Sequence, residues 1–397
     1  MDISAQALEQ FSGANGDSEL AANVRETMAG ITSQFDRQYL LDCWRKQEFT
    51  TALWDKMGEL GLLGIGVPES AGGMGGGLAE MALICDLLSQ AGMPPFLYTL
   101  TCFARTPVVK HGTPSQIAQF VTPTATGAKR MCFAITEPDA GTNSFRMSTK
   151  AERSAGGWVL NGQKVFISGA ADADLMMVIA RTRPYQEGED RKDGISVFVI
   201  DAKAKGLELN PLNIEMYLPE LQYQVYLNDV EVPEDALIGP EGKGLATLFD
   251  ALNPERLLIA SICVGTGDYA LGKVVDYVNQ RAPFGRPTGS YQGVQHPLAR
   301  AKSHLEAARL MTYFAARLFD GGGKAGPAAN MAKLLASEAG VEAVDAAIQF
   351  HGGYGFDEDY DIITLWPMLR LFKTAPLNNE MILNYIGEHI LHLPKSY

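Results

Sequence analysis

The stretch LNPERLLIASICVGTGDYALGKVVDYVNQR, residues 252–281, predicts a long helix with one carboxylate on an apolar face. Four aliphatic residues fall at steps of three and four around Glu255: Leu248, Leu252, Ile259 and Ile262. An ionised carboxylate on such a face is costly unless it is paired, and burial raises its pKa towards the range of a general base. The spacing therefore makes Glu255 a candidate base.

The same residues allow a second interpretation. Asn253, Pro254 and Glu255 resemble an N-cap, a first-turn proline and an acid at the positive end of a helix. Because capping acids far outnumber catalytic ones, the stretch alone favours a helix that begins near Asn253. Both interpretations stay open until the remaining chain is considered.

Composition limits the class of protein. The chain has 397 residues, 46% of them hydrophobic and 20% charged, which is enough for two or three packed units. Its net charge of −13 argues against nucleic acid and against an anionic membrane surface as partners. A local basic site for an anionic ligand remains compatible with this charge.

Neither the cysteines nor the N-terminal sequence indicates a disulfide scaffold, a metal site or a targeting peptide. Five cysteines are scattered without a CxxC pair, so we expect neither a disulfide scaffold nor a metal site, and a reducing cytoplasmic location fits best. The sequence MDISAQALEQFSG, residues 1–13, lacks the features of a secretion signal or transit peptide. No apolar run is expected to reach the length of a membrane span.

Periodicity divides the chain into three predicted domains of an α+β protein. Residues 1–128 form a helical domain, residues 129–243 a β-barrel or sandwich domain, and residues 244–397 a helical bundle. Predicted helices cover 20–31, 50–63, 78–90, 95–111, 246–281, 296–320, 327–350 and 377–392. Predicted strands cover 131–136, 158–160, 164–168, 175–181, 195–201 and 223–227. Between the second and third strands, Asn161-Gly162 predicts a hairpin turn.

Five motifs on this plan resemble the acyl-CoA dehydrogenase family. They are FAITEPDAGT (133–142), NGQKVFISGA (161–170), DVEVPEDALIGPEGKG (229–244), QRAPFGRPTGSYQGVQH (280–296) and QFHGGYGF (349–356). The resemblance covers nearly the whole chain. It implies an FAD-dependent enzyme with a helical N-terminal domain, a middle β domain and a C-terminal four-helix bundle, assembled as a homotetramer.

The resemblance also implies roles for individual residues. Thr136 and Ser168 would bond the isoalloxazine edge, with Phe166 against the ring. The positions implied to bind FAD are Phe133, Ile135, Thr136, Gly141, Thr142, Phe166, Ser168, Arg281, Phe284, Gln292, Gln349, Gly352 and Gly353. Those implied to bind substrate are Thr142, Arg256 and Ala375. Arg281 also has a physical reason, since a guanidinium suits a pyrophosphate.

The position of the base departs from the commonest family pattern. Most members carry the glutamate some 13 residues before an EH pair, and counting back from Glu388-His389 reaches Ala375. Long-chain and isovaleryl-CoA members place it instead on the helix that opens the C-terminal domain, where NPERLLIA offers Glu255. The absence at 375 and the presence at 255 together favour Glu255 as the base, although Pro254 could kink the helix and shift it.

The implied reaction is α,β-dehydrogenation of an acyl-CoA to a trans-2-enoyl-CoA. Glu255 would remove the α-proton while the β-hydride passes to flavin N5, and the backbone N–H of Ala375 would help to polarise the thioester carbonyl. Electrons would leave to an electron-transferring flavoprotein. Two alternatives remain: a flavin-dependent monooxygenase or oxidase of the same fold, and a non-catalytic binding or assembly protein.

Overall fold

The computed structural model describes residues 19–185, 190 and 192–395, and their contacts divide the chain into two compact units. The helical unit comprises the described residues up to 40, residues 76–95 and residues from 256 onward. The sheet unit comprises residues 41–75 and 96–255. These assignments group residues that are distant in the sequence, because helices near the N-terminus join the C-terminal bundle.

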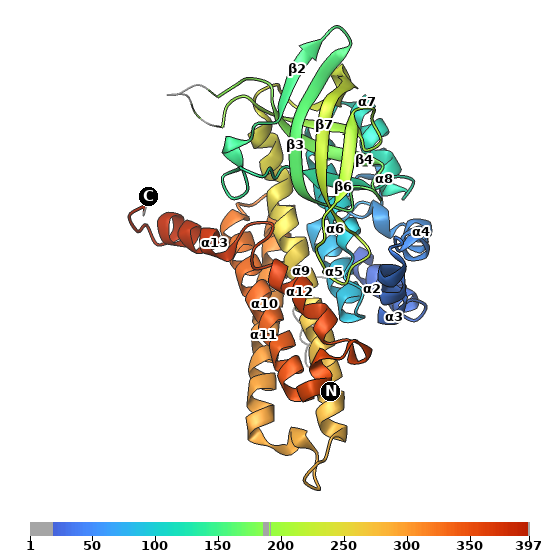
Figure 1. Cartoon of the computed structure of the whole chain (residues 1–397), viewed down its shortest axis with the longest axis vertical. Helices are drawn as coiled ribbons and strands as arrows, with labels where there is room; N and C mark the ends of the chain where they lie inside the picture. Colours follow the sequence, from blue (N-terminus) through green and yellow to red (C-terminus); the bar gives the residue numbers. More distant parts are fainter. Residues whose placement is uncertain (1–18, 186–189, 191, 396–397) are drawn as a thin grey trace. The chain divides into compact units, whose positions relative to one another are not determined.

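The helical unit is built from helices of very different lengths (Figure 1). It contains α2 (Glu19–Thr32), α5 (Leu78–Gln90), α10 (Gln292–Asp320), α11 (Gly326–His351), α12 (Trp366–Leu371), α13 (Asn379–Tyr385) and the second part of α9 (Gly244–Gln280). Helices α10 and α11 pack along one another, and α5 packs against α2 and α10. Helix α3 (Arg37–Lys46) begins in this unit and ends in the sheet unit.

A buried arginine ties three of these helices together. Arg309 of α10 is 0% exposed and donates to Asp86 of α5 at 2.9 Å from its Nε, and also to Asp268 of α9. Burial alone would lower the pKa of Arg309, but the surrounding carboxylates raise it well above its ordinary value. A fixed positive charge therefore joins α10 to an aspartate that lies 223 positions away in the chain.

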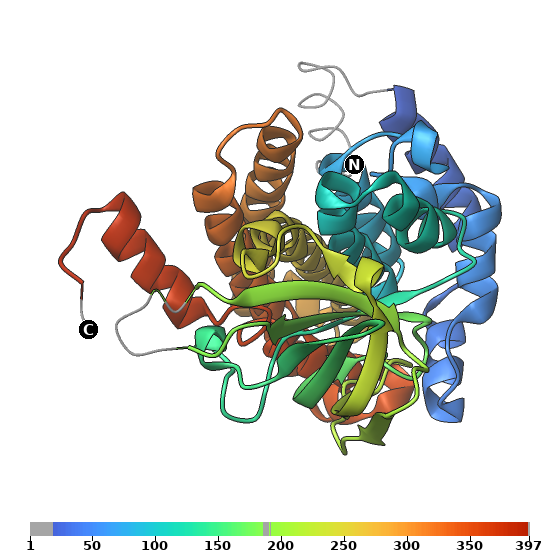
Figure 2. The ribbon, with the colours of Figure 1, turned by 90° about the horizontal axis from the view of Figure 1, so that it is seen from above.

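The sheet unit contains eight strands in the order β6-β7-β3-β2-β4-β5-β8, with β1 paired to β4. The strands are β1 (Met131–Ala134), β2 (Lys150–Ser154), β3 (Gly157–Ser168), β4 (Leu175–Arg181), β5 (Ile195–Asp201), β6 (Leu207–Pro211), β7 (Gln222–Pro233) and β8 (Leu237–Ile238). The unit also holds α4 (Thr51–Glu59), α6 (Phe96–His111), α7 (Pro114–Gln116) and α8 (Thr122–Ala125). Figure 2 views the sheet from above, with its strands in green and yellow-green.

The sheet curves around an apolar core. Trp158 of β3 and Phe198 of β5 are buried and meet edge to face, with ring centroids 5.4 Å apart, although two strands separate β3 from β5 in the sheet. Such pairs add to the free energy gained by burying the rings. The expected combination of helical regions with a central β domain is thereby confirmed.

The predicted hairpin at Asn161-Gly162 is wrong. These residues lie inside the single strand β3, and the tight turn comes earlier, between Ser154 of β2 and Gly157. Gly162 is needed for a different reason: its φ is 153°, and an added Cβ would lie 2.7 Å from the Cα of Thr149. Asn-Gly here permits a register shift and a close backbone approach rather than a chain reversal.

The expectation that no apolar run reaches the length of a membrane span is also wrong. Within the described residues, α9 has 37 residues and a mean hydropathy of 1.3 over its best window, which is sufficient by length and composition. That window is 72% buried in protein, as is usual for a core helix. Burial, not length, distinguishes this helix from a membrane span.

One buried carboxyl group in the sheet unit is held with a raised proton affinity. Glu220 lies between β6 and β7, is 5% exposed, and accepts a hydrogen bond at 3.2 Å from the backbone N–H of Leu97 in the first turn of α6. Burial raises the pKa of Glu220 from 4.5 to about 7, with a smaller contribution from Asp172 in the same direction. Folding therefore favours the protonated carboxyl group.

The pKa of Glu220 predicts a pH-dependent stability. Because the folded pKa lies above the unfolded one, the stabilising contribution is complete below pH 4.5 and is lost as the pH rises through about 7. In Glu220→Gln, the amide oxygen would keep an acceptor for Leu97 without a charge. We expect this variant to unfold at the same temperature as the native protein at pH 5 and a few degrees higher at pH 8.5. Scanning calorimetry measures both temperatures.

Glu208→Gln is the matched control, since Glu208 is exposed on the neighbouring strand β6. It should leave the unfolding temperature unchanged at both pH values. Equal unfolding temperatures for Glu220→Gln and the native protein at pH 8.5 would show that the buried carboxyl group carries no such cost.

Candidate functional site

In the sheet unit, the residues implied to face a flavin lie on β1, β3 and the loop after β1. Strand β1 ends at Ala134, and Thr136 follows in the loop, where its carbonyl oxygen accepts a 2.9 Å hydrogen bond from the backbone N–H of Val165 in β3. Ile135 and Thr136 are half-buried. The backbone contact brings the loop at Thr136 next to the part of β3 that carries Phe166 and Ser168.

Phe166 has the most unusual conformation in this group. The pairing of β3 with β7 is irregular between Lys164 and Ile167, and Phe166 takes a φ of 59° with 57% of its surface exposed. A bulky aromatic residue with positive φ is strained, and such strain persists where the surrounding structure enforces it. The bulge turns a ring outward from a largely buried strand, which suits a planar ligand.

A buried ion pair holds the two segments in place. Lys164 Nζ lies 2.9 Å from Glu137 Oε1 and donates to the carbonyl oxygen of Ile135 at 3.0 Å, and the side chains are 0% and 3% exposed. Glu137 also accepts hydrogen bonds from the backbone N–H groups of Ser148 at 2.6 Å and Thr149 at 3.0 Å. One carboxylate therefore fixes the β1 loop, β3 and the segment before β2.

Both members of the pair are charged at neutral pH. Burial alone would raise the pKa of Glu137, but the Lys164 ammonium and the hydrogen bonds from Ser148 and Thr149 outweigh it and lower the pKa to about 2. Burial lowers the pKa of Lys164 to about 8, against the opposing effect of Glu137. Removing either partner alone would leave a buried uncompensated charge.

The loop after this ion pair is open to a ligand. Gly141 and Thr142 are exposed, and an added Cβ at Gly141 would meet no protein atom within 4 Å. The protein's own packing therefore gives no reason for glycine at this position. A close approach by a bound molecule would give one.

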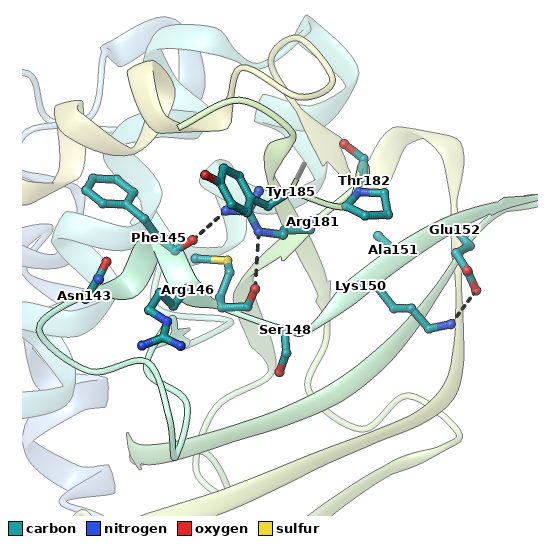
Figure 3. A pocket seen from close by; sticks show the side chains of 12 residues that line it. Asn143, Phe145, Arg146, Ser148, Lys150, Ala151, Glu152, Arg181, Thr182 and Tyr185 are labelled. Atoms are coloured by element: carbon teal, nitrogen blue, oxygen red, sulfur yellow. Dashed lines mark hydrogen bonds and ion pairs between the residues drawn. The ribbon is translucent and has the colours of Figure 1, made fainter. Parts of the chain in front are cut away.

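A cavity of about 720 Å³ lies beside this loop in the sheet unit (Figure 3). Arg181 fixes one wall, since its guanidinium donates to the carbonyl oxygens of Phe145 at 2.6 Å, Met147 at 3.3 Å and Asp193 at 3.0 Å. Arg146 and Lys150 add two exposed cations to the lining, and Lys150 Nζ lies 3.1 Å from Glu152, a carboxylate that also lines the cavity. The cavity therefore combines a fixed backbone with the Arg146 guanidinium, which suits an anionic group.

In the helical unit, a second cavity of about 630 Å³ lies at the end of α11. Four of the residues implied to bind FAD line it: Arg281, Gln349, Gly352 and Gly353. An added Cβ at either glycine would meet no protein atom within 4 Å, and Gly352 takes a φ of 63°. The arrangement brings a cation, an amide and exposed backbone to one concave surface.

The floor of this second cavity is aromatic. His351 is 4% exposed, stacks on Tyr277 with ring centroids 4.4 Å apart, and has its Nδ1 2.8 Å from the carbonyl oxygen of Ala347. Burial lowers the pKa of His351, which favours the neutral ring. The histidine therefore has a packing role. Phe284 and Gln292 do not line the cavity; both are exposed, Phe284 by 83%.

The structure excludes Asn253 as the cap of a helix. Helix α9 begins at Gly244, and Pro254 and Glu255 lie in its interior, so the helix continues through the proline. Glu255 and Arg256 are half-buried, while Leu248 and Ile259 on the same face are 2% and 4% exposed. Glu255 is therefore a carboxylate on an apolar face with no capping function.

The expected role of the Ala375 N–H is wrong in this structure. This N–H donates to the carbonyl oxygen of Leu371 at 2.9 Å, and the following bond, Ala375-Pro376, is cis. The group closes a turn after α12 and is not a free donor for a thioester carbonyl.

Sequence reasoning missed the groups that hold the site together. Glu137 and Lys164 lie within the quoted motifs without an assigned role, and Arg181 lies outside those motifs. A signal existed for Lys164, because a lysine in an alternating strand at an inward position needs a buried anion. No local pattern indicates that Arg181 would bind three carbonyl oxygens, since those partners are backbone atoms.

The residues fit a flavin. The sheet unit offers an exposed aromatic ring at Phe166, a half-buried hydroxyl at Ser168 and open backbone at Gly141. The helical unit offers Arg281 beside open glycine backbone. The groups in the sheet unit suit a planar ring system, and the groups in the helical unit suit a pyrophosphate or an adenosine.

Comparison with known proteins identifies the family over nearly the whole chain. Three family models match: the acyl-CoA dehydrogenase N-terminal domain at residues 18–128, the middle domain at 132–230 and the C-terminal domain at 242–391. The acyl-CoA dehydrogenase FadE12 of Mycobacterium tuberculosis (strain ATCC 25618 / H37Rv) is 40% identical over 384 residues, covering 96% of this chain and 98% of its own.

Two further proteins are similar. The caffeyl-CoA reductase-Etf complex subunit CarC of Acetobacterium woodii is 32% identical over 328 residues, covering 82% of this chain and 86% of its own. The FAD complex of PigA has the same fold, with a TM-score of 0.87 and 26% identity, covering 95% of this chain and 98% of that one. Together with the matched domains and the site geometry, these likenesses show that the chain belongs to the acyl-CoA dehydrogenase family, a family of flavin-dependent oxidoreductases.

Proposed function

We propose that the protein catalyses FAD-dependent α,β-dehydrogenation of an acyl-CoA thioester to a trans-2-enoyl-CoA, with Glu255 as the base. The observation that carries this proposal is the placement of Glu255 inside α9, on a face whose neighbours Leu248 and Ile259 are buried. A carboxylate without a capping role on an apolar helix face is a candidate for proton abstraction.

The chain's own groups account for most of the reaction. FAD, when bound, supplies the two-electron acceptor for the β-hydride. Glu255 takes the α-proton, and an acyl chain bound against this helix face excludes water from the carboxylate. Phe166 provides a ring surface that orients the reactants, and the Lys164–Glu137 pair keeps the Phe166 and Thr136 segments in fixed register.

Replacing Glu255 tests the assignment of the base. Glu255→Gln keeps the shape of the side chain and removes the proton acceptor, so we expect flavin bleaching by acyl-CoA to slow by about 100- to 10,000-fold. Stopped-flow absorbance under anaerobic conditions, with a panel of straight, branched and ring-bearing acyl-CoAs, measures the rate. The fastest substrate of the native protein identifies the acyl class.

Asp250→Asn is the control for this experiment, because Asp250 lies about one and a half turns earlier on α9 and pairs with Lys110 and His111 at the surface. It should bleach at nearly the native rate. Equal bleaching by Glu255→Gln and the native protein would place the base elsewhere. Oxygen consumption coupled to turnover would instead favour the monooxygenase or oxidase reaction.

A second candidate function is the reverse reaction, reduction of an enoyl-CoA. The observation that favours it is the likeness to CarC, a subunit of a caffeyl-CoA reductase-Etf complex. The two directions differ in which species oxidises or reduces the flavin. If chemically reduced protein is reoxidised by an enoyl-CoA faster than oxidised protein is bleached by the matching acyl-CoA, reduction is the favoured direction.

The cavity beside Arg181 suits the phosphates of coenzyme A. Arg146 and Lys150 line it, and the backbone that carries Arg146 is held by the Arg181 guanidinium. Its position directly after Gly141 and Thr142 joins it to residues implied to contact flavin and substrate. We therefore assign this cavity to the anionic end of the acyl-CoA.

Arg146→Ala tests that assignment. An exposed cation that contacts phosphate contributes to binding of substrate and transition state alike, so we expect KM for the acyl-CoA to rise several-fold while kcat stays near the native value. Steady-state kinetics with an artificial electron acceptor gives both constants. Lys56→Ala removes a cation from α4 and should change neither KM nor kcat. A fall in kcat at constant KM for Arg146→Ala would reject the phosphate role.

The second cavity suits the pyrophosphate and adenosine of FAD. Arg281 is exposed, and among the described residues its guanidinium forms no ion pair, so it can bind phosphate oxygens. The resemblance assigns Arg281, Phe284 and Gln292 to the FAD of a neighbouring subunit. We propose a homotetramer on this basis, and an electron-transferring flavoprotein as the electron acceptor, supported by the likeness to the Etf-linked CarC.

Loss of the Arg281 cation should weaken flavin retention. We expect Arg281→Ala to lose most of its bound flavin during gel filtration, with the fraction retained read from the absorbance ratio of flavin to protein. Arg300→Ala removes an exposed arginine from α10 and should retain flavin as the native protein does. If Arg281→Ala retains flavin fully, the pyrophosphate is bound by other groups.

A further inference from the structure

Gln222 forms a close two-point contact with Ser168. The two residues are register partners across the antiparallel pair β3 and β7. Ser168 Oγ lies 2.9 Å from Gln222 Oε1 and 2.7 Å from Gln222 Nε2. Both ends of one amide thus reach one hydroxyl oxygen, and no other hydrogen bond to either side chain is found in the part of the chain that the structure describes.

The contact leaves the hydroxyl two ways of bonding a third group. When the amide N–H donates to Oγ, the Ser168 proton is free to be donated to a ligand. When Ser168 donates to Oε1, its oxygen is free to accept from a ligand. Because Gln222 supplies both a donor and an acceptor, it can hold the Ser168 hydroxyl either as a donor or as an acceptor towards the ligand without moving.

The position of Gln222 argues against a purely structural pair. Register partners share a face of the sheet, so the Gln222 amide and the Ser168 hydroxyl lie on the same face, two residues beyond the exposed Phe166 of the bulge. The neighbours Ile167 and Tyr223 point the opposite way, into the apolar core. Gln222 is only 5% exposed, so its amide is costly to bury, and an apolar cross-strand pair would hold the strands as well.

We propose that Gln222 is a positioning residue that orients the Ser168 hydroxyl towards the flavin in both of its redox states. The inference rests on the proposed function and on the role that the family resemblance implies for Ser168, which would bond the isoalloxazine edge. An oxidised flavin presents acceptor nitrogens at that edge, whereas a two-electron-reduced flavin also presents an N–H donor. The hydroxyl must therefore donate to oxidised flavin and accept from reduced flavin. In the second state its own proton needs an acceptor, which Gln222 Oε1 supplies, so loss of the amide weakens the contact with reduced flavin more than the contact with oxidised flavin.

A double-mutant cycle on the flavin potential tests this role without using substrate. Gln222→Met keeps the side-chain length and removes the amide, and Ser168→Ala removes the hydroxyl. The midpoint potential of bound flavin is measured by equilibration with a reference dye and a chemical reductant. We expect Gln222→Met to change the oxidised-to-reduced ratio about tenfold, about 30 mV for a two-electron couple, and to cause no shift when Ser168 is already alanine.

Gln224→Met is the matched control, since Gln224 lies two residues along β7 on the same face and pairs with Asn210 in the register. It should leave the potential unchanged. An equal shift from Gln222→Met in the native and Ser168→Ala backgrounds would overturn the proposal, because Gln222 would then act independently of the hydroxyl. No shift in either background would overturn it as well.

If the variants bind flavin too weakly for a potential measurement, the same double-mutant cycle can be measured on the fraction of flavin that each variant retains. Loss of flavin by both Gln222→Met and Gln222→Leu, with full retention by Ser168→Ala, would show a role unrelated to Ser168 and overturn the proposal. Weakening that is not additive across the cycle would support it. A native protein that no acyl-CoA or enoyl-CoA reduces or oxidises would refute the proposed function, yet the potential cycle would still report on Gln222.

Discussion

The buried contact between Lys164 and Glu137 is the constraint on which the candidate site depends. Its two charges lie 2.9 Å apart at almost zero exposure, and their remaining hydrogen bonds go to backbone groups of Ile135, Ser148 and Thr149. A buried pair of this kind adds little to stability compared with an apolar pair, because desolvation offsets the attraction. Its value here is geometric, since three chain segments acquire a single arrangement around it.

The helical unit uses the same physics for another purpose. Arg309 joins Asp86 and Asp268 from helices that are distant in sequence, and none of these groups belongs to a predicted binding set. In the sheet unit the buried charges lie next to a strained aromatic residue and an open glycine. The buried charges of the helical unit thus fix helix packing, whereas those of the sheet unit fix the segments that carry the candidate flavin-binding residues.

Periodicity predicted the regular elements well and the special backbone poorly. The strands at 175–181 and 195–201 and the helix at 78–90 match the structure to the residue, because long apolar patterns define them. Asn161-Gly162 was misread, since the same dipeptide serves a chain reversal or a close approach, and only Thr149 on the next segment distinguishes them. The bond from Ala375 N–H to Leu371 and the amide at Gln222 depend on tertiary geometry that no local pattern encodes.

The guanidinium of Arg181 holds the segment around Arg146 through the main-chain carbonyl oxygens of Phe145 and Met147, and it binds the carbonyl oxygen of Asp193 as well. Every residue type carries that carbonyl, so the half-buried side chain of Phe145 can be exchanged without loss of these hydrogen bonds, whereas Met147 is 4% exposed and is also held by packing. The backbone path of this segment therefore depends on one arginine of β4, while the exposed side chains on the segment can change. A scaffold of this kind can acquire a new ligand preference by substitution in the loop and keep its fold intact.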